Sequence, residues 1–271
     1  MTQRPSPRIL SIAGSDSSGG AGIQADIKTI AMLGGYAMTA ITAVTAQNTV
    51  GVQGIAPMGG EIVARQVTSC IEDIGVDAIK IGMLHDGEII DAVATSLEGV
   101  DVPIVLDPVM IATSGAALIS QDAIALMRER LFPRATLVTP NLPELEHLAG
   151  RTLRSSTETT EALEQMVADY DTAVLAKGGH TEDARIIDFL GMPGKATISF
   201  ESQRIDTPHT HGTGCTLSSA IATLLGHGQP LAHAVDLGRQ FVRAAIENAP
   251  GFGNGNGPLG HHTVRSLQSS S

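Results

Sequence analysis

A glycine-rich segment late in the chain has the residue types that bind phosphate. The sequence HTHGTGCT at positions 209–216 comes directly before an apolar helical pattern that includes Leu217, Ile221 and Leu224. Backbone N–H groups at the start of such a helix point outward, and the helix dipole favours phosphate oxygens there. Gly212 and Gly214 would let a phosphate approach the backbone closely. We therefore expect an anion hole at 212–215.

Cys215 lies inside this segment. The helix N-terminus should lower the pKa of its thiol, which would make it available as a base or nucleophile at neutral pH. A helix capped by Thr213, with a small buried cysteine, would give the same local sequence. A zinc site formed by His209, His211 and Cys215 is disfavoured, since no fourth ligand lies at a familiar spacing.

Other polar residues directly follow apolar runs that read as strands. Asp107 ends one run, and Asn141 and Glu144 follow another, so their oxygens would suit a hydrated Mg²⁺. Asn141 could equally be a helix N-cap with Glu144 as its partner in the first turn. Lys177 follows a third run and could reach a transferring phosphate, or it could be an ordinary solvated lysine.

The loop at 14–22 is also rich in glycine. Gly14 and Gly19 have the spacing of a Walker A motif, but Gly20 and Ala21 occupy the positions where that motif requires Lys and Ser or Thr. A dinucleotide fingerprint fails as well, because the third glycine is absent. The segment is then either a turn shaped around a small ligand or a plain strand-to-helix loop.

The strands and helices that must position these residues alternate along the chain. Each short apolar run, typical of a strand, is followed by apolar residues at helical spacing, and this alternation predicts a mostly parallel sheet covered by helices. In such sheets ligands bind outside the carboxyl ends of the strands. We expect strands at 8–13, 36–46, 78–81, 103–106, 136–138 and 173–176, helices near 23–30, 62–74, 88–97, 122–131, 161–170, 212–225 and 230–249, and a short antiparallel edge from extended runs at 184–190, 196–200 and 203–205.

Composition limits the classes of function. The chain has 271 residues, 42% hydrophobic and 17% charged, which predicts one ordered domain over 1–271 with a mobile tail from about 250. A net charge of −11 and only 3% aromatic residues disfavour nucleic acid as a partner. No apolar stretch approaches the roughly 18 residues of a membrane span, so a cytoplasmic protein without membrane attachment is expected. Only two cysteines are present, which argues against a secreted disulfide framework, and Cys70 falls on the apolar face of a helix.

Seven ordered motifs together resemble the hydroxymethylpyrimidine/phosphomethylpyrimidine kinases of thiamine biosynthesis, within the ribokinase-like superfamily. They are AGSDSSGGAGIQAD (13–26), AQNT (46–49), KIGML (80–84), DPVM (107–110), TPNLPE (139–144), KGGH (177–180) and HGTGC (211–215). The resemblance spans nearly the whole chain, including the glycine-rich end at 253–258. It implies a ribokinase-like α/β fold and a homodimer. It also implies phosphorylation of 4-amino-5-hydroxymethyl-2-methylpyrimidine with ATP and Mg²⁺, followed by a second transfer to give the diphosphate.

The resemblance also assigns roles to residues. It implies a pyrimidine pocket formed by Gly14, Ala21, Val44, Gln47, Met83 and Val109, with Asp26 nearby. Gln47 can donate to and accept from the aminopyrimidine edge. It implies catalysis by Cys215, Lys177, Gly212 and Gly214, nucleotide binding by Thr213, Gly214 and Lys177, and a metal group of Asp107, Asn141 and Glu144.

Two other functions remain open. A pyridoxal kinase with a cysteine in its anion hole would have the same fold. A non-catalytic pyrimidine-binding regulator is the alternative outside the enzymes, although such a protein would not need the phosphate-handling residues.

Overall fold

The computed structural model describes residues 6–110, 119–179 and 184–264. Within these residues a nine-stranded sheet has the order β3-β2-β1-β4-β5-β6-β7-β8-β9. The six central strands pair in parallel, in the order β2-β1-β4-β5-β6-β7. At the two edges, β3 and the pair β8 and β9 are antiparallel to their neighbours. The strands are β1 (Arg8–Asp16), β2 (Tyr36–Gln47), β3 (Val52–Pro57), β4 (Ala78–Ile81), β5 (Ile104–Leu106), β6 (Leu137–Val138), β7 (Ala173–Ala176), β8 (Arg185–Gly191) and β9 (Ile198–Gln203).

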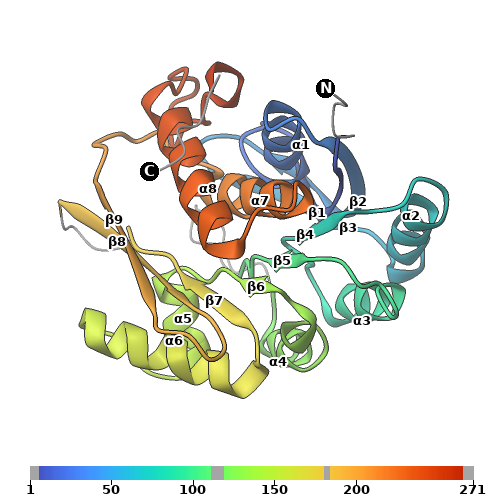
Figure 1. Ribbon diagram of the computed structural model, residues 1–271. Helices are drawn as coiled ribbons and strands as arrows, with labels where there is room; N and C mark the ends of the chain where they lie inside the picture. The colour runs from blue at the N-terminus through green and yellow to red at the C-terminus, as the bar shows by residue number, and fades with distance from the viewer. Residues whose placement is uncertain (1–5, 111–118, 180–183, 265–271) are drawn as a thin grey trace, which may run out of the picture.

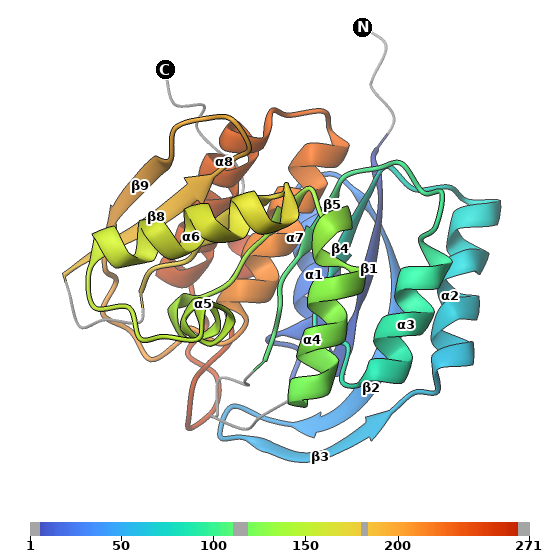
Figure 2. The same ribbon diagram turned by 90° about the horizontal axis from the view of Figure 1, so that it is seen from below.

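Helices cover both faces of this sheet (Figure 1). The first face carries α1 (Gly22–Met32), α7 (Thr213–Gly226) and α8 (Leu231–Glu247), and a short 3₁₀ turn at His261–Thr263 follows. The second face carries α2 (Gly60–Asp73), α3 (Gly87–Ser96), α4 (Gln121–Arg130), α5 (Leu142–Ala149) and α6 (Ser156–Tyr170), with a 3₁₀ turn at Phe132–Arg134; Figure 2 shows several of these side by side. The expected α/β class, with a mostly parallel sheet between helices, is confirmed.

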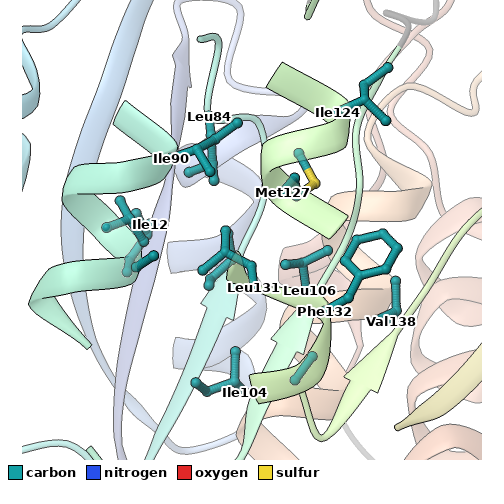
Figure 3. Close-up of a cluster of buried hydrophobic side chains, with 14 of the residues drawn as sticks. Ile12, Leu84, Ile90, Ile104, Leu106, Ile124, Met127, Leu131, Phe132 and Val138 are labelled. Atoms are coloured by element: carbon teal, nitrogen blue, oxygen red, sulfur yellow. The ribbon is translucent and has the colours of Figure 1, made fainter. Parts of the chain in front are cut away.

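Alternation along the strands gives each face its own core. In β1, Leu10 and Ile12 face the helices α2 to α6, whereas Ile9 faces α1, α7 and α8. A strand that is covered on both faces can be apolar throughout, which explains the continuous apolar run at its start. Figure 3 shows part of the larger core, where Phe132 packs with Leu106 and Val138.

Three features differ from the expectations. The segment Val52–Pro57 is a strand with half-buried or exposed residues, although a polar loop was expected between 46 and 62. The three extended runs after 184 give two strands, β8 and β9, because β9 ends at Gln203, the first residue of the third run. Antiparallel pairing is therefore present at both edges of the sheet and not at one.

The glycine-rich end was expected to be a mobile tail from about 250; in the structure residues 251–254 are exposed, and part of the segment from 257 to 264 is buried. Leu259, His261 and Val264 are buried, and Leu259 and Val264 join Phe241 of α8 in a small core. Residues 265–271 lie outside the described part of the chain. In the described residues, no helix is long and apolar enough to cross a membrane.

Candidate active site

The loops at the carboxyl ends of the parallel strands surround one cavity of about 960 Å³. This volume is typical of small-molecule sites. Residues that follow β1, β4, β5, β6 and β7 line it, together with the start of α7. The cavity therefore collects side chains that are far apart in sequence, as open parallel sheets do at this edge.

The N-terminus of α7 forms one part of this lining. Gly212 is the N-cap, with a φ of 87°, and the first N–H to bond back into the helix is that of Thr216, which donates to Gly212 O at 2.9 Å. The N–H groups of Gly214 and Cys215 precede it, so they have no intrahelical acceptor. These N–H groups are available to an anion, as the anion-hole expectation requires. A Cβ on Gly212 would lie 1.9 Å from Gly20 O, which explains the glycine.

Lys177 and Asp107 lie against this helix end. Lys177 Nζ donates to Asp107 Oδ1 at 2.7 Å, and a Cβ on Gly214 would lie 3.1 Å from Asp107 Oδ2 and 3.3 Å from Lys177 Nζ. Burial lowers the pKa of Lys177, but the carboxylates of Asp107 and Glu144 outweigh burial, so the pKa is raised. The lysine is a cation held by Asp107, with 12% of its side chain exposed, and not a freely solvated surface residue.

Asn141 and Glu144 form a capping box at the start of α5. Asn141 Oδ1 accepts from Glu144 N at 2.9 Å, and Glu144 Oε2 accepts from Asn141 N at 2.8 Å. The structural interpretation of this pair is thus confirmed, and both residues also line the cavity. Burial raises the pKa of Glu144 to about 7, with Lys177 opposing and Asp107 reinforcing the shift.

These acidic residues fit a hydrated Mg²⁺. In the described part of the chain, no three His, Cys, Asp or Glu side chains converge as a preformed metal cage. Mg²⁺ commonly keeps several waters and binds one or two carboxylates together with substrate phosphates. Burial is the largest cause of the high pKa of Glu144; Lys177 opposes it and Asp107 reinforces it. A divalent cation would stabilise the ionised form of Glu144 beside Asp107.

The pKa of the Cys215 thiol was expected to be lowered, and this prediction is wrong. The thiol lines the cavity, but burial raises its pKa to about 11, and the opposing effects of Lys80 and the Gly22 N–H are smaller. Partial dipole charge at the helix N-terminus does not overcome the cost of burying a thiolate among carboxylates. Cys215 is therefore protonated at neutral pH. We call the group of Asp107, Glu144, Lys177 and residues 212–215 the phosphate wall.

A second part of the cavity lining is nearly neutral. Gly14, Ala21, Gln47, Met83 and Val109 all line the cavity, as the resemblance implied. A Cβ on Gly14 would lie 2.4 Å from Met83 Cε, so the glycine allows the methionine to pack across the β1 loop. We call these five residues, together with Asp16 and His211, the ring wall.

Two residues expected in the pyrimidine pocket do not line the cavity. The Val44 side chain is nearly half exposed on β2, where the strand pairs with β3. Asp26 is fully buried behind the site, where its carboxylate binds Lys80 Nζ at 2.9 Å and accepts from Ser11 and Ser219. This closed network supports α1 and α7 from beneath.

Asp16 and His211 are the site residues that sequence reasoning missed. Asp16 lines the cavity and accepts from the N–H groups of Gly20 and Ala21 and from Ser18, and His211 Nε2 lies 2.8 Å from its Oδ2. Burial raises the pKa of Asp16, but these hydrogen bonds, led by that of His211, lower it to about 2. Both residues stand inside quoted motifs, yet 195 positions separate them, so no local signal pairs them.

Residues near the end of the described chain form hydrogen bonds with the loop that carries His211 and with α7. Gly257 O accepts from His211 N at 3.1 Å, and His261 Nε2 lies 2.8 Å from Thr216 Oγ1 of α7. Cβ atoms on Gly255 and Gly257 would lie 2.1 Å from Thr49 O and 2.2 Å from His209 Nδ1. The glycines allow the chain end to lie against both loops. His180 of the KGGH motif is outside the described residues.

Comparisons with known proteins assign the chain to a family. A family model for phosphomethylpyrimidine kinase matches residues 16–260. A hydroxymethylpyrimidine/phosphomethylpyrimidine kinase of Bacillus subtilis is 43% identical over 260 residues, which cover 95% of this chain and 96% of that protein.

Solved structures show the same fold. A Bacillus subtilis pyridoxal kinase in complex with ADP has a TM-score of 0.87 at 34% identity, covering 96% of this chain and 99% of that one. A Clostridium difficile phosphomethylpyrimidine kinase has a TM-score of 0.78 at 37% identity, covering 89% and 99%. The expected ribokinase-like fold is confirmed, and the chain belongs to the phosphomethylpyrimidine kinase family.

Proposed function

We propose that this protein transfers phosphate from ATP to 4-amino-5-hydroxymethyl-2-methylpyrimidine, and then to the monophosphate to give the diphosphate, in thiamine biosynthesis. One observation carries the proposal. A single cavity is lined both by neutral residues suited to a flat ring and by a helix N-terminus with a largely buried lysine, suited to phosphate. A hydroxymethyl arm on the ring would lie between the two.

The phosphate wall supplies what phosphoryl transfer needs. The reaction passes through a loose transition state, so positioning and electrostatic stabilisation contribute most of the catalysis. Free N–H groups of Gly214 and Cys215 would hold the transferring phosphoryl group, and Lys177 would neutralise its charge. We assign ATP phosphates to Thr213, Gly214 and Lys177; the related pyridoxal kinase solved with ADP supports a nucleotide at this fold's site.

Cys215 acts in this proposal as a proton relay. Its thiol is protonated in the free site, so it does not start as a thiolate base. The substrate hydroxyl would pass its proton to sulfur as the thiol proton moves to an oxygen of the transferred phosphate. A loose transition state demands little prior deprotonation of the hydroxyl, which suits such a relay.

Asp107, Glu144 and the neighbouring Asn141 would hold a hydrated Mg²⁺. When bound, the ion offsets phosphate charge and orients the transferring group. Before it binds, Lys177 is held on Asp107 at 2.7 Å and Glu144 is held by the capping box. We also propose, from the resemblance, that the enzyme is a cytoplasmic homodimer.

The test is a product assay with ATP and Mg²⁺. We expect the monophosphate to appear first and the diphosphate to follow in the same reaction mixture. Monophosphate alone after exhaustive incubation would remove the second activity. No transfer at all, while the pyrimidine still binds, would favour the non-catalytic regulator.

Pyridoxal phosphorylation is the second candidate, since the related Bacillus subtilis structure is a pyridoxal kinase. Both substrates are flat rings with a hydroxymethyl arm. Gln47 discriminates between them, because one carboxamide can pair with both an amino group and a ring nitrogen, and pyridoxal lacks that pair. An unpaired buried amide costs about 1–3 kcal/mol, so the pyrimidine should be preferred roughly tenfold to a hundredfold.

Gln47→Leu should lose this preference. The measurement is kcat/KM for both substrates in the wild type and the variant. A ratio that the substitution leaves unchanged, or a wild type that prefers pyridoxal, would move the assignment to pyridoxal kinase.

A further inference from the structure

A fully buried ion pair lies behind the active site, and the proposed reaction does not yet use it. Lys80 Nζ of β4 binds Asp26 Oδ2 of α1 at 2.9 Å, and neither side chain has any exposed surface. Asp26 also accepts from Ser11 Oγ of β1 and from Ser219 Oγ of α7, each at 2.5 Å. Among the described residues, Asp26 provides the one hydrogen bond that Lys80 Nζ makes.

Such a pair is not the usual way to stabilise a core. Taking two charges out of water can cost more than their attraction returns, and apolar side chains of similar volume can often replace a buried ion pair without loss of stability. The neighbours of Lys80 on the same face of the sheet, Ala78 and Val105, are apolar core residues. A requirement of the active site therefore explains the pair better than a requirement of the core.

The pair belongs to a polar layer directly below the floor of the cavity. Two residues along a strand and four along a helix both advance about 6 to 7 Å, so β1, β4, α1 and α7 stay in step as they leave the cavity. The lower layer consists of Ser11, Lys80, Asp26 and Ser219, and the next layer toward the cavity consists of Ala13, Gly82, Gly22 and Cys215. Ala13, Gly22 and Cys215 line the cavity.

The Lys80 side chain extends from the lower layer toward this floor. A Cβ added to Gly82 would lie 2.6 Å from Lys80 Nζ and 3.1 Å from Ala13 Cβ. Gly82 is not among the glycines with positive φ, so the space that it leaves for the ammonium explains the glycine, and backbone freedom does not. The ammonium therefore reaches the level of the cavity floor.

The charged groups around Cys215 come from several elements. Burial raises the pKa of its thiol most; Lys80 of β4 opposes this shift, and Asp26 of α1 and Asp107 after β5 reinforce it by smaller amounts. Lys177, after β7, is the other cation that interacts with Cys215. Burial lowers the pKa of Lys80, but Asp26, Cys215 and Asp107 outweigh burial, so Lys80 stays an ammonium.

We propose that Lys80 is a second cation of the reaction beside Lys177, and that Asp26 holds its ammonium beneath Cys215. This step rests on the proposed function. As the substrate oxygen bonds to the transferred phosphorus and ADP leaves, the sulfur gives its proton to a phosphate oxygen and receives the proton of the hydroxyl. Lys80 stabilises the negative charge on the sulfur when its own proton leaves first. Lys80 acts through Cys215 without touching the substrate, so it is a positioning residue.

The first test measures the reactivity of Cys215 without any substrate. In the Cys70→Ala background, Cys215 is the one cysteine that iodoacetamide can alkylate. At a mildly alkaline pH, Lys80→Met removes the cation and should slow alkylation about tenfold, whereas Asp26→Asn removes the anion and should speed it severalfold. Two substitutions that only loosened the fold would not change the rate in opposite directions.

Two further variants separate the effect of charge from that of folding. Arg8→Met breaks the ion pair with Asp77 at the other end of β1 and should leave the alkylation rate unchanged. Lys80→Met/Asp26→Leu replaces the buried pair with apolar side chains, so it should fold even where a single variant does not. Because Lys80 affects Cys215 more than Asp26 does, this double variant should be alkylated more slowly than the wild type.

The second test measures turnover with ATP, Mg²⁺ and the pyrimidine. Lys80→Met should lower kcat about tenfold to a hundredfold with little change in KM, which is less than the loss of a donor that touches the phosphate. The double variant should lower kcat by a smaller factor.

Alkylation rates that change in the same direction in Lys80→Met and Asp26→Asn would overturn the proposal. A folded double variant with the alkylation rate and the kcat of the wild type would also overturn it. If the wild type phosphorylates no pyrimidine, the proposed function fails, and the alkylation rates still decide whether Lys80 acts on Cys215.

Discussion

The phosphate wall is built from charged side chains at strand ends, whereas the ring wall is built from glycines and neutral side chains around one carboxylate. Burial, reinforced by Asp107 and opposed by Lys177, keeps the pKa of Glu144 near 7. Asp16 in the ring wall is fully satisfied by donors, and its pKa lies near 2. The phosphate wall is thus prepared for a cation and phosphates that arrive later, and the ring wall is complete before substrate binds.

This difference predicts which substitutions affect turnover and which affect substrate preference or the stability of the fold. Changes in the phosphate wall should lower kcat. Changes in the supporting contacts should alter stability and positioning with smaller effects on the chemical step.

Cys215→Ala is expected to have the largest effect. Loss of the relay should lower kcat by roughly 10² to 10⁴, with a much smaller change in KM for the pyrimidine. Cys70→Ala, at a half-buried residue packed against the core on the second face of the sheet, is the control and should retain activity. Turnover near the wild-type value in Cys215→Ala would leave the anion-hole amides to act alone.

The high pKa of Cys215 can be checked separately. Its alkylation rate by iodoacetamide in the Cys70→Ala background should keep rising up to pH 10, because the thiolate fraction grows until the pKa near 11 is passed. A rate that levels off near pH 7 would show the lowered pKa first expected from sequence.

Gly212→Ala should be next in size, because it affects both walls where they meet. The new Cβ would meet Gly20 O, and the φ of 87° is unfavourable for alanine. We expect kcat to fall by about 10² to 10³ as the anion-hole donors shift, and the Tm to fall. Gly228→Ala has a similar φ of 81° with nothing within 4 Å, so it should lower the Tm while kcat is unchanged. Similar kcat values in the two variants would contradict this account.

Gly255→Ala should have a smaller effect on turnover. Its Cβ would meet Thr49 O, so the chain end would move from the loop at 48–51 and loosen its hold on His211. Overpacking of this kind costs about 1–3 kcal/mol, and we expect a several-fold rise in KM for the pyrimidine. Gly51→Ala, where nothing lies within 4 Å, should match the wild type. An unchanged KM would show that the chain end serves stability alone.

The smallest effect concerns pH and His261. Burial lowers the pKa of His261 to about 4, helped by nearby Lys28. Between pH 4 and about 6.5 His261 binds more protons in the unfolded than in the folded state, so its own contribution to stability should rise with pH across this window. From pH 5 to pH 7.5 the contribution of His261 should be about 2 kcal/mol at one pKa unit per 1.36 kcal/mol; Glu144, with its raised pKa, contributes in the opposite direction.

Urea unfolding at these two pH values, in the wild type and in His261→Gln, measures that contribution as the difference between the two pH dependences. His261→Gln keeps a donor near Thr216 but does not titrate, so the variant should lack the contribution of His261 and keep that of Glu144. His262→Gln, at the exposed neighbouring residue, should retain both contributions. An equal pH dependence in His261→Gln and the wild type would exclude His261 as the source.

Local features of the sequence determined much of the fold and part of the site. Strand and helix alternation depends on neighbouring residues, so the sheet between two helical layers was predictable. The Asn141–Glu144 capping box spans three positions, and Gly212 precedes its helix directly, so both were visible in the sequence. The strand β3 was missed because it lies at an edge with exposed residues and lacks an apolar signal. The packed chain end was missed because its glycines contact neighbours through the backbone rather than through apolar side chains.

Only the tertiary structure decided the rest of the site. The pKa of Cys215 depends on burial and on Lys80, Asp26 and Asp107, groups that the fold brings together from distant strands and helices. The pairing of Asp16 with His211 spans 195 positions, and that of Lys177 with Asp107 spans 70. A sequence specifies which groups are available to ionise or donate. Their distances and their access to water, which set charge and hydrogen-bond direction, exist only in the folded chain.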